Sequence, residues 1–310
     1  MPVSLAGKTA VVTGSGSGLG AAYAIALADA GAAVIVNDVS EEAAAATVAA
    51  IVAAGGKAAV VVAAVGSAET AQQLVDTALA EFGGFDILVT NAGILRDKSL
   101  LKMTDDDFDQ VIAVHLRGTF TCARAAYASF REREVAGRII AIGSPTGQRG
   151  NFGQTNYAAA KAGIVGMVRT WALEMTRAGV TVNAVIPVAA TAMTRTVPYF
   201  AAAIEADEAG RPMPDFYRAD LGFGTAADVG GLIVYLASDE SAGITGQAIG
   251  IGGDRLQLWS HPEPVLTSYR DGGWSAEAIA ADFAPELRTE LRSVGEEFPA
   301  LPPEHQRASR

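Results

Sequence analysis

An apolar run, a glycine-rich loop and a helix-like stretch follow one another near the start of the chain. TAVVT (9–13) is β-branched and apolar, GSGSGLG (14–20) can adopt unusual backbone angles, and the alanine-rich residues after it suit a helix. Loop N–H groups and the positive end of a helix dipole together favour an anion. The order predicts a strand, a phosphate-binding turn and a helix. The residues expected to contact the ligand are Gly14, Ser17, Gly18, Leu19 and Gly20.

The alternation of apolar runs with alanine-rich helical stretches continues to about residue 253. Runs such as AVVVAA and RIIAI are apolar throughout, as in parallel strands covered on both faces. The pattern predicts an α/β fold with a single doubly wound Rossmann-type domain (1–255), a seven-stranded parallel sheet and a C-terminal extension (256–310). Strands are expected near 9–13, 33–37, 58–63, 87–91, 138–142, 180–186 and 247–251.

The second apolar run ends in Asp38, twenty residues after Gly18. At the end of such a strand, a carboxylate can accept hydrogen bonds from the adenosine ribose and would repel a 2′-phosphate. No Lys or Arg stands in the glycine loop or beside Asp38, so the pattern favours NAD over NADP. The alternative is a helix cap or turn residue, because Ser40 and Glu41 begin another helical stretch.

Tyr157 and Lys161 lie four residues apart in NYAAAK, and Ser144 ends the apolar run RIIAIG. Residues i and i+4 share a helix face, so the Lys161 ammonium can favour the Tyr157 phenolate. A phenol with a pKa of ~10 needs such a cation, and a hydrogen bond to its oxygen, to exchange protons near neutral pH. Each residue alone is more often an ordinary core or surface residue, but the combination indicates acid–base chemistry.

Composition narrows the possible partners. A formal net charge of −11 argues against nucleic-acid binding and against an anionic membrane surface. One cysteine, Cys122, excludes an internal disulfide and suits a reducing compartment. We see no apolar signal core and no run of transmembrane length, so a cytoplasmic protein is expected. Asp105 to Asp107 follow Thr104 before a helical pattern, which indicates a helix cap, and no metal site is expected.

Several motifs together resemble those of the short-chain dehydrogenases/reductases over about residues 5–253: TGSGSGLG (13–20), Asp38, TNAG (90–93), Ser144, Tyr157-x-x-x-Lys161 and NAVIP (183–187). The resemblance implies that Tyr157 is the acid/base, that Lys161 lowers its pKa and holds the nicotinamide ribose, and that Ser144 orients the substrate oxygen. It also implies further residues beside the cofactor, namely Asn91, Ala92, Gly93, Pro187 and Thr191. Val65 stands where an aspartate commonly contacts adenine, which implies apolar packing only.

His115, in AVHLRGTF, stands where most members of that family carry an asparagine that holds a water in a proton relay. Histidine can also bond a water, and its titration near neutral pH would make the relay pH-sensitive. The alternative is a buried structural imidazole.

Four segments are similar to one branch of the family: VND (36–38), AGILRDKSL (92–100), GNFGQTNYAAAK (150–161) and IPVAATAMT (186–194). That branch is the (3R)-hydroxyacyl-CoA dehydrogenase domain of peroxisomal multifunctional enzyme type 2 and its free-standing bacterial relatives. The likeness implies NAD-dependent oxidation of a secondary alcohol, as in a 3-hydroxyacyl thioester, and a homodimer or homotetramer. The alternatives are a 3-oxoacyl-ACP, steroid or other carbonyl reductase, and a dinucleotide sensor without turnover.

Two later regions depart from the strand–helix alternation. Residues 194–222 carry Pro, Gly and aromatics where such folds place a substrate lid, and Phe200, Phe216 and Tyr217 are candidates to cover the substrate. The 256–310 extension is rich in proline and has three short helical patterns. It could reach across a subunit interface and border the substrate site, or form a loosely packed extension. Its residues Trp259 and Trp274 favour docking.

Overall fold

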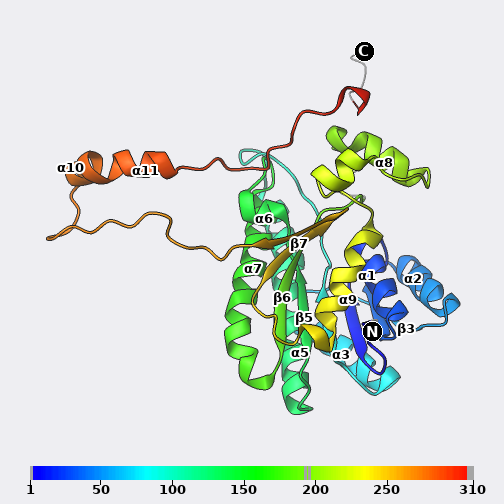
Figure 1. Ribbon diagram of the computed structural model, residues 1–310. Coiled ribbons are helices and arrows are strands. Elements are labelled where there is room, and N and C mark those ends of the chain that lie inside the picture. Colours follow the sequence, from blue (N-terminus) through cyan, green and yellow to red (C-terminus); the bar gives the residue numbers. More distant parts are fainter. Residues whose placement is uncertain (1–2, 192–193, 195–196, 306–310) are drawn as a thin grey trace.

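The computed structural model describes residues 3–191, 194 and 197–305 (Figure 1). Within them, eight strands form one sheet in the order β3-β2-β1-β4-β5-β6-β7-β8, and neighbours among β1 to β7 all pair in parallel. The predicted α/β class is confirmed. The parallel strands are β1 (Thr9–Thr13), β2 (Ala33–Asp38), β3 (Lys57–Val62), β4 (Ile87–Thr90), β5 (Arg138–Ile142), β6 (Thr181–Pro187) and β7 (Ala248–Gly252).

An eighth strand, β8 (Arg255–Trp259), corrects the predicted seven-stranded parallel sheet. It pairs antiparallel with β7, with Gly252 opposite Arg255. The two residues between them, Gly253 and Asp254, form a hairpin turn in which Gly253 has a φ of +50°. Glycine at the first position suits the tight turns that match strand twist. The Gly-Asp pair between two apolar runs was therefore the sequence signal for this strand.

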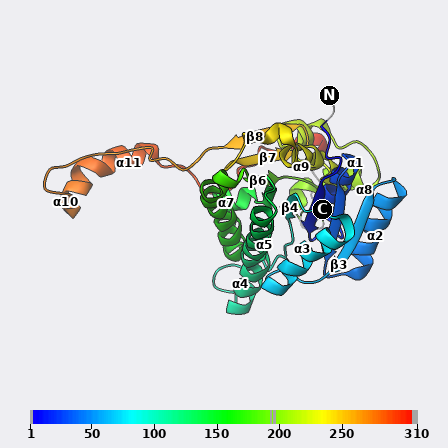
Figure 2. The same cartoon turned by 90° about the horizontal axis from the view of Figure 1, so that it is seen from below.

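The main helices cover both faces of the sheet (Figure 2). Strand side chains alternate between the faces, so that Val11 packs in one core and Val12 in the other. The first core contains residues of α3 (Ala68–Phe82), α5 (Gly118–Glu132) and α7 (Thr155–Met175), and the second contains residues of α1 (Gly18–Asp29), α2 (Glu41–Ala53) and α9 (Gly230–Ala237). Burial on both faces explains why the strands are apolar throughout.

Shorter elements connect these layers. Thr104 caps α4 in a capping box with Asp107, as predicted for the acidic run. The remaining α-helices are α4 (Asp105–Val111), α6 (Pro145–Arg149), α8 (Ala201–Glu208), α10 (Ala276–Ala278) and α11 (Ala284–Glu290). The π segments are η1 (Ile112–Arg117), η4 (Phe216–Asp220) and η7 (Ile279–Phe283). The 3-10 segments are η2 (Thr176–Ala178), η3 (Pro198–Phe200), η5 (Ala226–Val229), η6 (Asp239–Ser241) and η8 (Pro303–His305).

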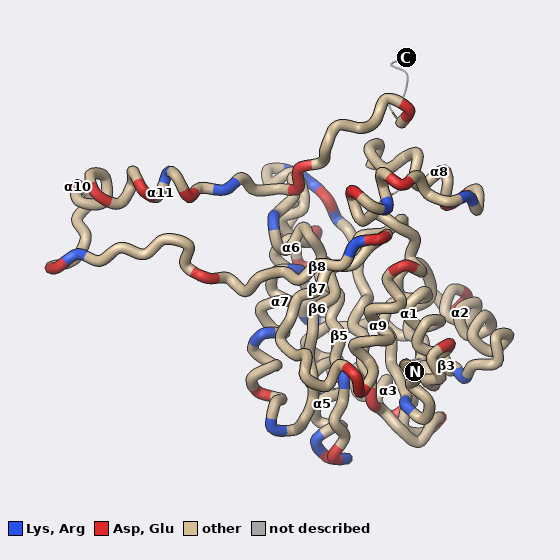
Figure 3. Tube along the Cα trace, viewed as in Figure 1, with Lys and Arg blue, Asp and Glu red and all other residues tan. Residues whose placement is uncertain are grey.

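After β8 the chain leaves the body, forms α10 and α11 as a projecting arm, and returns past α6 towards α8 (Figure 1). Acidic and basic residues are interspersed along this arm (Figure 3). Trp259 packs against the core, and the centre of its ring lies 5.6 Å from the Arg149 guanidinium carbon. Trp274 instead contacts Phe283 within the arm. The extension therefore docks on the body of the protein at Trp259, as expected, whereas Trp274 packs within the arm.

Among the described helices, we find none with the length and apolar content required to cross a lipid bilayer.

Candidate active site

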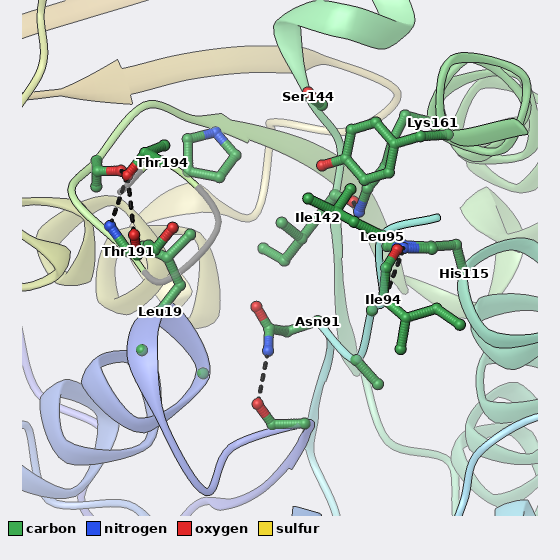
Figure 4. A pocket seen from close by; sticks show the side chains of 18 of the residues that line it. Leu19, Asn91, Ile94, Leu95, His115, Ile142, Ser144, Lys161, Thr191 and Thr194 are labelled. Atoms are coloured by element: carbon green, nitrogen blue, oxygen red, sulfur yellow. Dashed lines mark hydrogen bonds between the residues drawn. The ribbon is translucent and has the colours of Figure 1, made fainter. Parts of the chain in front are cut away.

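A cavity of about 680 Å³ lies along the carboxyl edge of the sheet. Parallel strands all end at this edge, so residues far apart in the sequence meet there. All the residues predicted to bind the cofactor or to take part in catalysis line the cavity: Gly14, Ser17, Gly18, Leu19, Gly20, Asp38, Val65, Asn91, Ala92, Gly93, His115, Ser144, Tyr157, Lys161, Pro187 and Thr191. Figure 4 shows Lys161 and His115 on one side of this space and Leu19 and Thr191 on the other.

The glycine turn after β1 is shaped by close backbone packing. Gly14 has a φ of +61°, and a Cβ at this position would lie 2.6 Å from Ala92 Cα. The Asn91 side chain donates hydrogen bonds to the Thr13 carbonyl at 3.0 Å and the Gly14 carbonyl at 2.9 Å. These contacts tie the end of β4 to the turn. At Gly18, where α1 begins, an added Cβ would meet no atom within 4 Å, so the turn leaves open space where N–H groups favour a phosphate.

Asp38 combines the two alternatives that its position in the sequence left open. One carboxylate oxygen accepts a hydrogen bond from Gly16 N at 2.9 Å, and the other accepts one from Ser40 N at 3.0 Å. Ser40 in turn caps α2. The side chain also lines the cavity, and a carboxylate has lone pairs beyond these two bonds. Asp38 therefore shapes the turn and can still meet a ribose.

Tyr157 and Lys161 lie one turn apart on α7, as their spacing predicted. The Lys161 ammonium lies 5.6 Å from the centre of the Tyr157 ring and donates a 2.7 Å hydrogen bond to the Ile142 carbonyl. Lys161 is 3% exposed, and Ser144 is buried at the N-cap of α6. The three side chains meet beside the end of β5.

Burial is the main influence on the pKa values of Tyr157 and Lys161. Burial raises the pKa of Tyr157, while its hydrogen bond with Ser144 acts in the opposite direction. Burial also lowers the pKa of Lys161 to about 7. The net direction for the Tyr157 pKa is upward, because loss of hydration outweighs the hydrogen bond with Ser144 and the Asp97 carboxylate adds to the rise. That Lys161 lowers the Tyr157 pKa during the reaction stays a prediction.

The buried ammonium of Lys161 predicts a stability that rises with pH. Its pKa is about 7 when folded and 10.5 as a free side chain, so between these values the unfolded chain binds more protons. The free energy of unfolding should then increase by up to about 1.4 kcal/mol per pH unit, and show no Lys161 contribution to its slope below pH 7. Urea denaturation from neutral to alkaline pH measures this slope.

The Lys161→Met variant should lose this contribution, while Lys57→Met, at an exposed position on β3, should keep it. Equal slopes in wild type and Lys161→Met would contradict the prediction.

His115 lies in the π segment η1, which turns its ring into the site. Its Nε2 lies 3.0 Å from Ile94 N and 2.8 Å from the Ile94 carbonyl, and its ring meets that of Tyr157 edge-on at 5.2 Å. Burial, reinforced by the charge of Lys161, lowers the His115 pKa to about 3. The imidazole is therefore neutral near pH 7, which corrects the expectation of a pH-sensitive titration there.

The other ring nitrogen of His115, Nδ1, is buried and has no hydrogen-bond partner among the described residues. Buried polar atoms are normally paired, often by a water. The contact of Nε2 with Ile94 fits a structural imidazole. The unpaired Nδ1 fits a residue that holds a water in a proton relay.

Of the three lid aromatics predicted to cover the substrate, only one lines the cavity. Phe200 lines the cavity, but Phe216 and Tyr217 pack within the lid instead. Residues 195–196 of the predicted lid lie outside the described residues. Sequence reasoning missed other lining residues, chiefly Leu95, Asn151, Gln154, Val188, Val197, Leu221, Phe223, Glu296 and Phe298. No periodicity distinguishes these loop and tail positions. Four of them nevertheless fall in segments already singled out, namely Leu95, Asn151, Gln154 and Val188, and Val197 and Leu221 fall in the predicted lid.

The fold and the site define a dinucleotide-dependent α/β oxidoreductase. The sheet is doubly wound, and one cavity brings together the glycine turn, the acidic residue at the end of β2 and the Ser–Tyr–Lys group. A family model described as enoyl-(acyl carrier protein) reductase matches residues 14–253. The chain belongs to the short-chain dehydrogenase/reductase family.

Its relatives include the 3-oxoacyl-[acyl-carrier-protein] reductase FabG of Thermotoga maritima, which is 38% identical over 80% of this chain and 98% of its own. Hydroxyacyl-CoA dehydrogenase ChsB1 of Mycobacterium tuberculosis is 39% identical over 89% of this chain and 87% of its own. Mouse peroxisomal multifunctional enzyme type 2 is 44% identical over 63% of this chain and 27% of its own. The crystal structure of a short chain dehydrogenase from Mycobacterium avium matches with a TM-score of 0.80 and 33% identity, covering 96% of this chain and 99% of that one.

Proposed function

We propose that this protein is an NAD-dependent dehydrogenase that interconverts a 3-hydroxyacyl-CoA and the corresponding 3-oxoacyl-CoA, with a role in lipid metabolism. The observation that carries the proposal is the meeting of Ser144, Tyr157 and Lys161 in the cavity that the glycine turn also lines. The relative named hydroxyacyl-CoA dehydrogenase supports the substrate class.

The cavity fits a nicotinamide dinucleotide, because the glycine turn lines it and a Cβ added at Gly18 would meet no atom within 4 Å, which leaves open space beside the N–H groups of the turn. Glycine-turn residues would hold its phosphate end, with Asn91 fixing the turn through its bonds to Thr13 and Gly14, and Asp38 would meet its adenosine ribose. When bound, the dinucleotide supplies the hydride acceptor or donor.

The chain's own groups handle the proton. In the oxidation direction the Tyr157 hydroxyl oxygen, as phenolate, accepts the proton of the substrate hydroxyl, and Ser144 donates a hydrogen bond that orients the substrate oxygen. Lys161, with a pKa of about 7, can exchange a proton near neutral pH. His115 Nδ1 would hold a water that passes the proton outward.

The alternative, a 3-oxoacyl-ACP reductase, draws support from the relatives in Thermotoga maritima and Synechocystis. An acidic carrier protein would need a basic patch, for which the sequence offers Arg131, Arg133 and Arg138, with Glu132 and Glu134 interleaved among them. Arg138 is 4% exposed and donates to the Ser238 carbonyl, so it is not available to a partner. It also begins β5, whereas the cavity lies at the opposite end of that strand. This placement favours a free CoA thioester.

A panel of 3-hydroxyacyl-CoA esters, acyl-ACP and steroid alcohols, assayed with NAD and NADP in parallel, tests the proposal. NAD-dependent turnover of the CoA esters is expected. Turnover of acyl-ACP alone with NADPH would support the carrier-protein reductase, turnover of the steroids alone would support the carbonyl reductase, and dinucleotide binding without any turnover would support the sensor.

The Asp38→Asn variant should lower the NAD-over-NADP preference in kcat/KM by roughly tenfold, which is ~1.4 kcal/mol. Asparagine can still accept the Gly16 hydrogen bond but no longer repels a 2′-phosphate. Steady-state kinetics with both dinucleotides measures the change. Asp29→Asn, at the exposed end of α1, is the control and should keep the wild-type ratio. A wild type that prefers NADP would overturn the role of Asp38.

We further propose a homodimer or homotetramer formed through α5 and α7, which follow β4 and β5. Large apolar side chains on these helices face outward, with Phe120 40% and Leu173 82% exposed. A mass of two or four times 31.7 kDa by light scattering is expected, and a monomer would contradict it. Cys122 is buried as a free thiol, in keeping with a cytoplasmic setting.

A further inference from the structure

The tail of the chain returns from the arm and crosses the lid. Gly295 N donates a 2.8 Å hydrogen bond to the Arg149 carbonyl at the end of α6. Beyond it, the ring of Phe298 stacks on Tyr199 with centroids 4.8 Å apart, and the Tyr199 hydroxyl donates a 2.8 Å hydrogen bond to the Pro299 carbonyl. The returning segment is therefore held by a backbone hydrogen bond to the end of α6 and by ring stacking on Tyr199 of the lid.

The same segment also touches the hydrophobic interior of the lid. Leu301 packs against the cluster formed by Phe200, Tyr217 and their neighbours, and the ring of His305 lies 5.3 Å from that of Tyr217. Residues 295–305, called here the tail clasp, thus contact the lid from η3 to η4. A lid held at several points exchanges less readily with open conformations.

The tail clasp also enters the active-site cavity. Glu296 and Phe298 line it together with Ser144 and Tyr157. The Phe298 ring meets the Phe200 ring edge-on at 5.5 Å, and Phe200 in turn stacks on Phe223 at 4.1 Å. The tail and the lid therefore form one aromatic wall of the substrate end, apart from the glycine turn.

We propose that the tail clasp completes the substrate site and that Phe298 is a specificity-determining residue, which contacts the apolar part of the acyl chain beyond the reacting carbon. The clasp also holds the lid through Tyr199 and Pro299. The assignment of an acyl chain rests on the proposed function, whereas the contact between clasp and lid does not. Phe298 is 43% exposed, so it has surface left for a ligand.

The kinetic test uses the full-length Phe298→Ala variant with 3-hydroxybutyryl-CoA and 3-hydroxydodecanoyl-CoA. Loss of a buried aromatic contact is expected to raise KM for the long ester by about tenfold. KM for the short ester should rise less, because its chain does not reach Phe298 and it loses only the restraint on the lid. Tyr269→Ala removes another tail aromatic, 91% exposed in the arm, and should change neither KM. Equal changes for both esters would overturn the role of Phe298.

A second test needs no turnover. Hydrogen exchange of lid amides in α8 and η4 should accelerate in Phe298→Ala and in Tyr199→Phe, which keeps the ring but loses the bond to Pro299. Amides of α3 serve as the internal control. If the wild type oxidises no 3-hydroxyacyl-CoA, the proposed function fails and the exchange rates still decide whether the clasp holds the lid. Unchanged lid exchange would overturn the clasp.

Discussion

Replacing Tyr157 by phenylalanine should lower kcat for the proposed 3-hydroxyacyl-CoA substrate by about a thousandfold, within the range that positioned acid–base groups contribute. The change removes the oxygen that exchanges the proton and leaves the ring against Lys161 and His115. Dinucleotide binding should persist, because the glycine turn and Asp38 are untouched. Rapid-mixing kinetics and NADH fluorescence titration measure the two effects separately.

The matched control is Tyr235→Phe on α9, where the ring is 36% exposed and lies outside the cavity. It should keep the wild-type rate. A Tyr157→Phe enzyme within tenfold of wild type would show that another group exchanges the proton, and the assignment of Tyr157 would be wrong.

Replacing Gly20 by alanine should abolish dinucleotide binding and lower the free energy of unfolding by about 3 kcal/mol, the upper range for overpacking. A Cβ at this position would overlap the Gly14 carbonyl oxygen and lie 2.5 Å from Asn91 Nδ2. Backbone atoms of the turn cannot move aside without losing the Asn91 hydrogen bonds. Denaturant titration and NADH fluorescence measure the losses in stability and binding.

Gly231→Ala on α9 is the control for helix propensity. An added Cβ there meets no atom within 4 Å, so alanine should stabilise the helix by up to about 1 kcal/mol. The two substitutions are chemically identical and should have effects of opposite sign on stability. A stable Gly20→Ala protein that binds NADH would contradict the close packing of the turn.

Much of the fold and site followed from local patterns. Each parallel strand reads as an apolar run because both of its faces are buried, and the observed strands agree with the expected ranges to within one residue at each end. The predicted residues then had to converge, because each lies at or beyond the end of such a strand or on the helix after it. The strand β8 was missed, although its Gly-Asp turn was readable.

The degree to which each side chain is buried could not be predicted from local patterns, because it depends on all the elements that surround that side chain in the fold. The sequence placed Lys161 beside Tyr157 and His115 in the site, but their pKa directions are dominated by loss of hydration. Residue spacing on one helix says nothing about how much water the surrounding elements exclude.

The sequence by itself determined the strand–helix alternation, the glycine turn and the shared helix face of Tyr157 and Lys161, because short-range backbone preferences, the period of apolar residues and residue spacing encode them. Only the tertiary structure decided that His115 is neutral, that burial governs the Tyr157 pKa, and that Phe298 enters the cavity. These properties arise from contacts between segments far apart in the chain, such as Tyr199 with Pro299, and no local pattern specifies them.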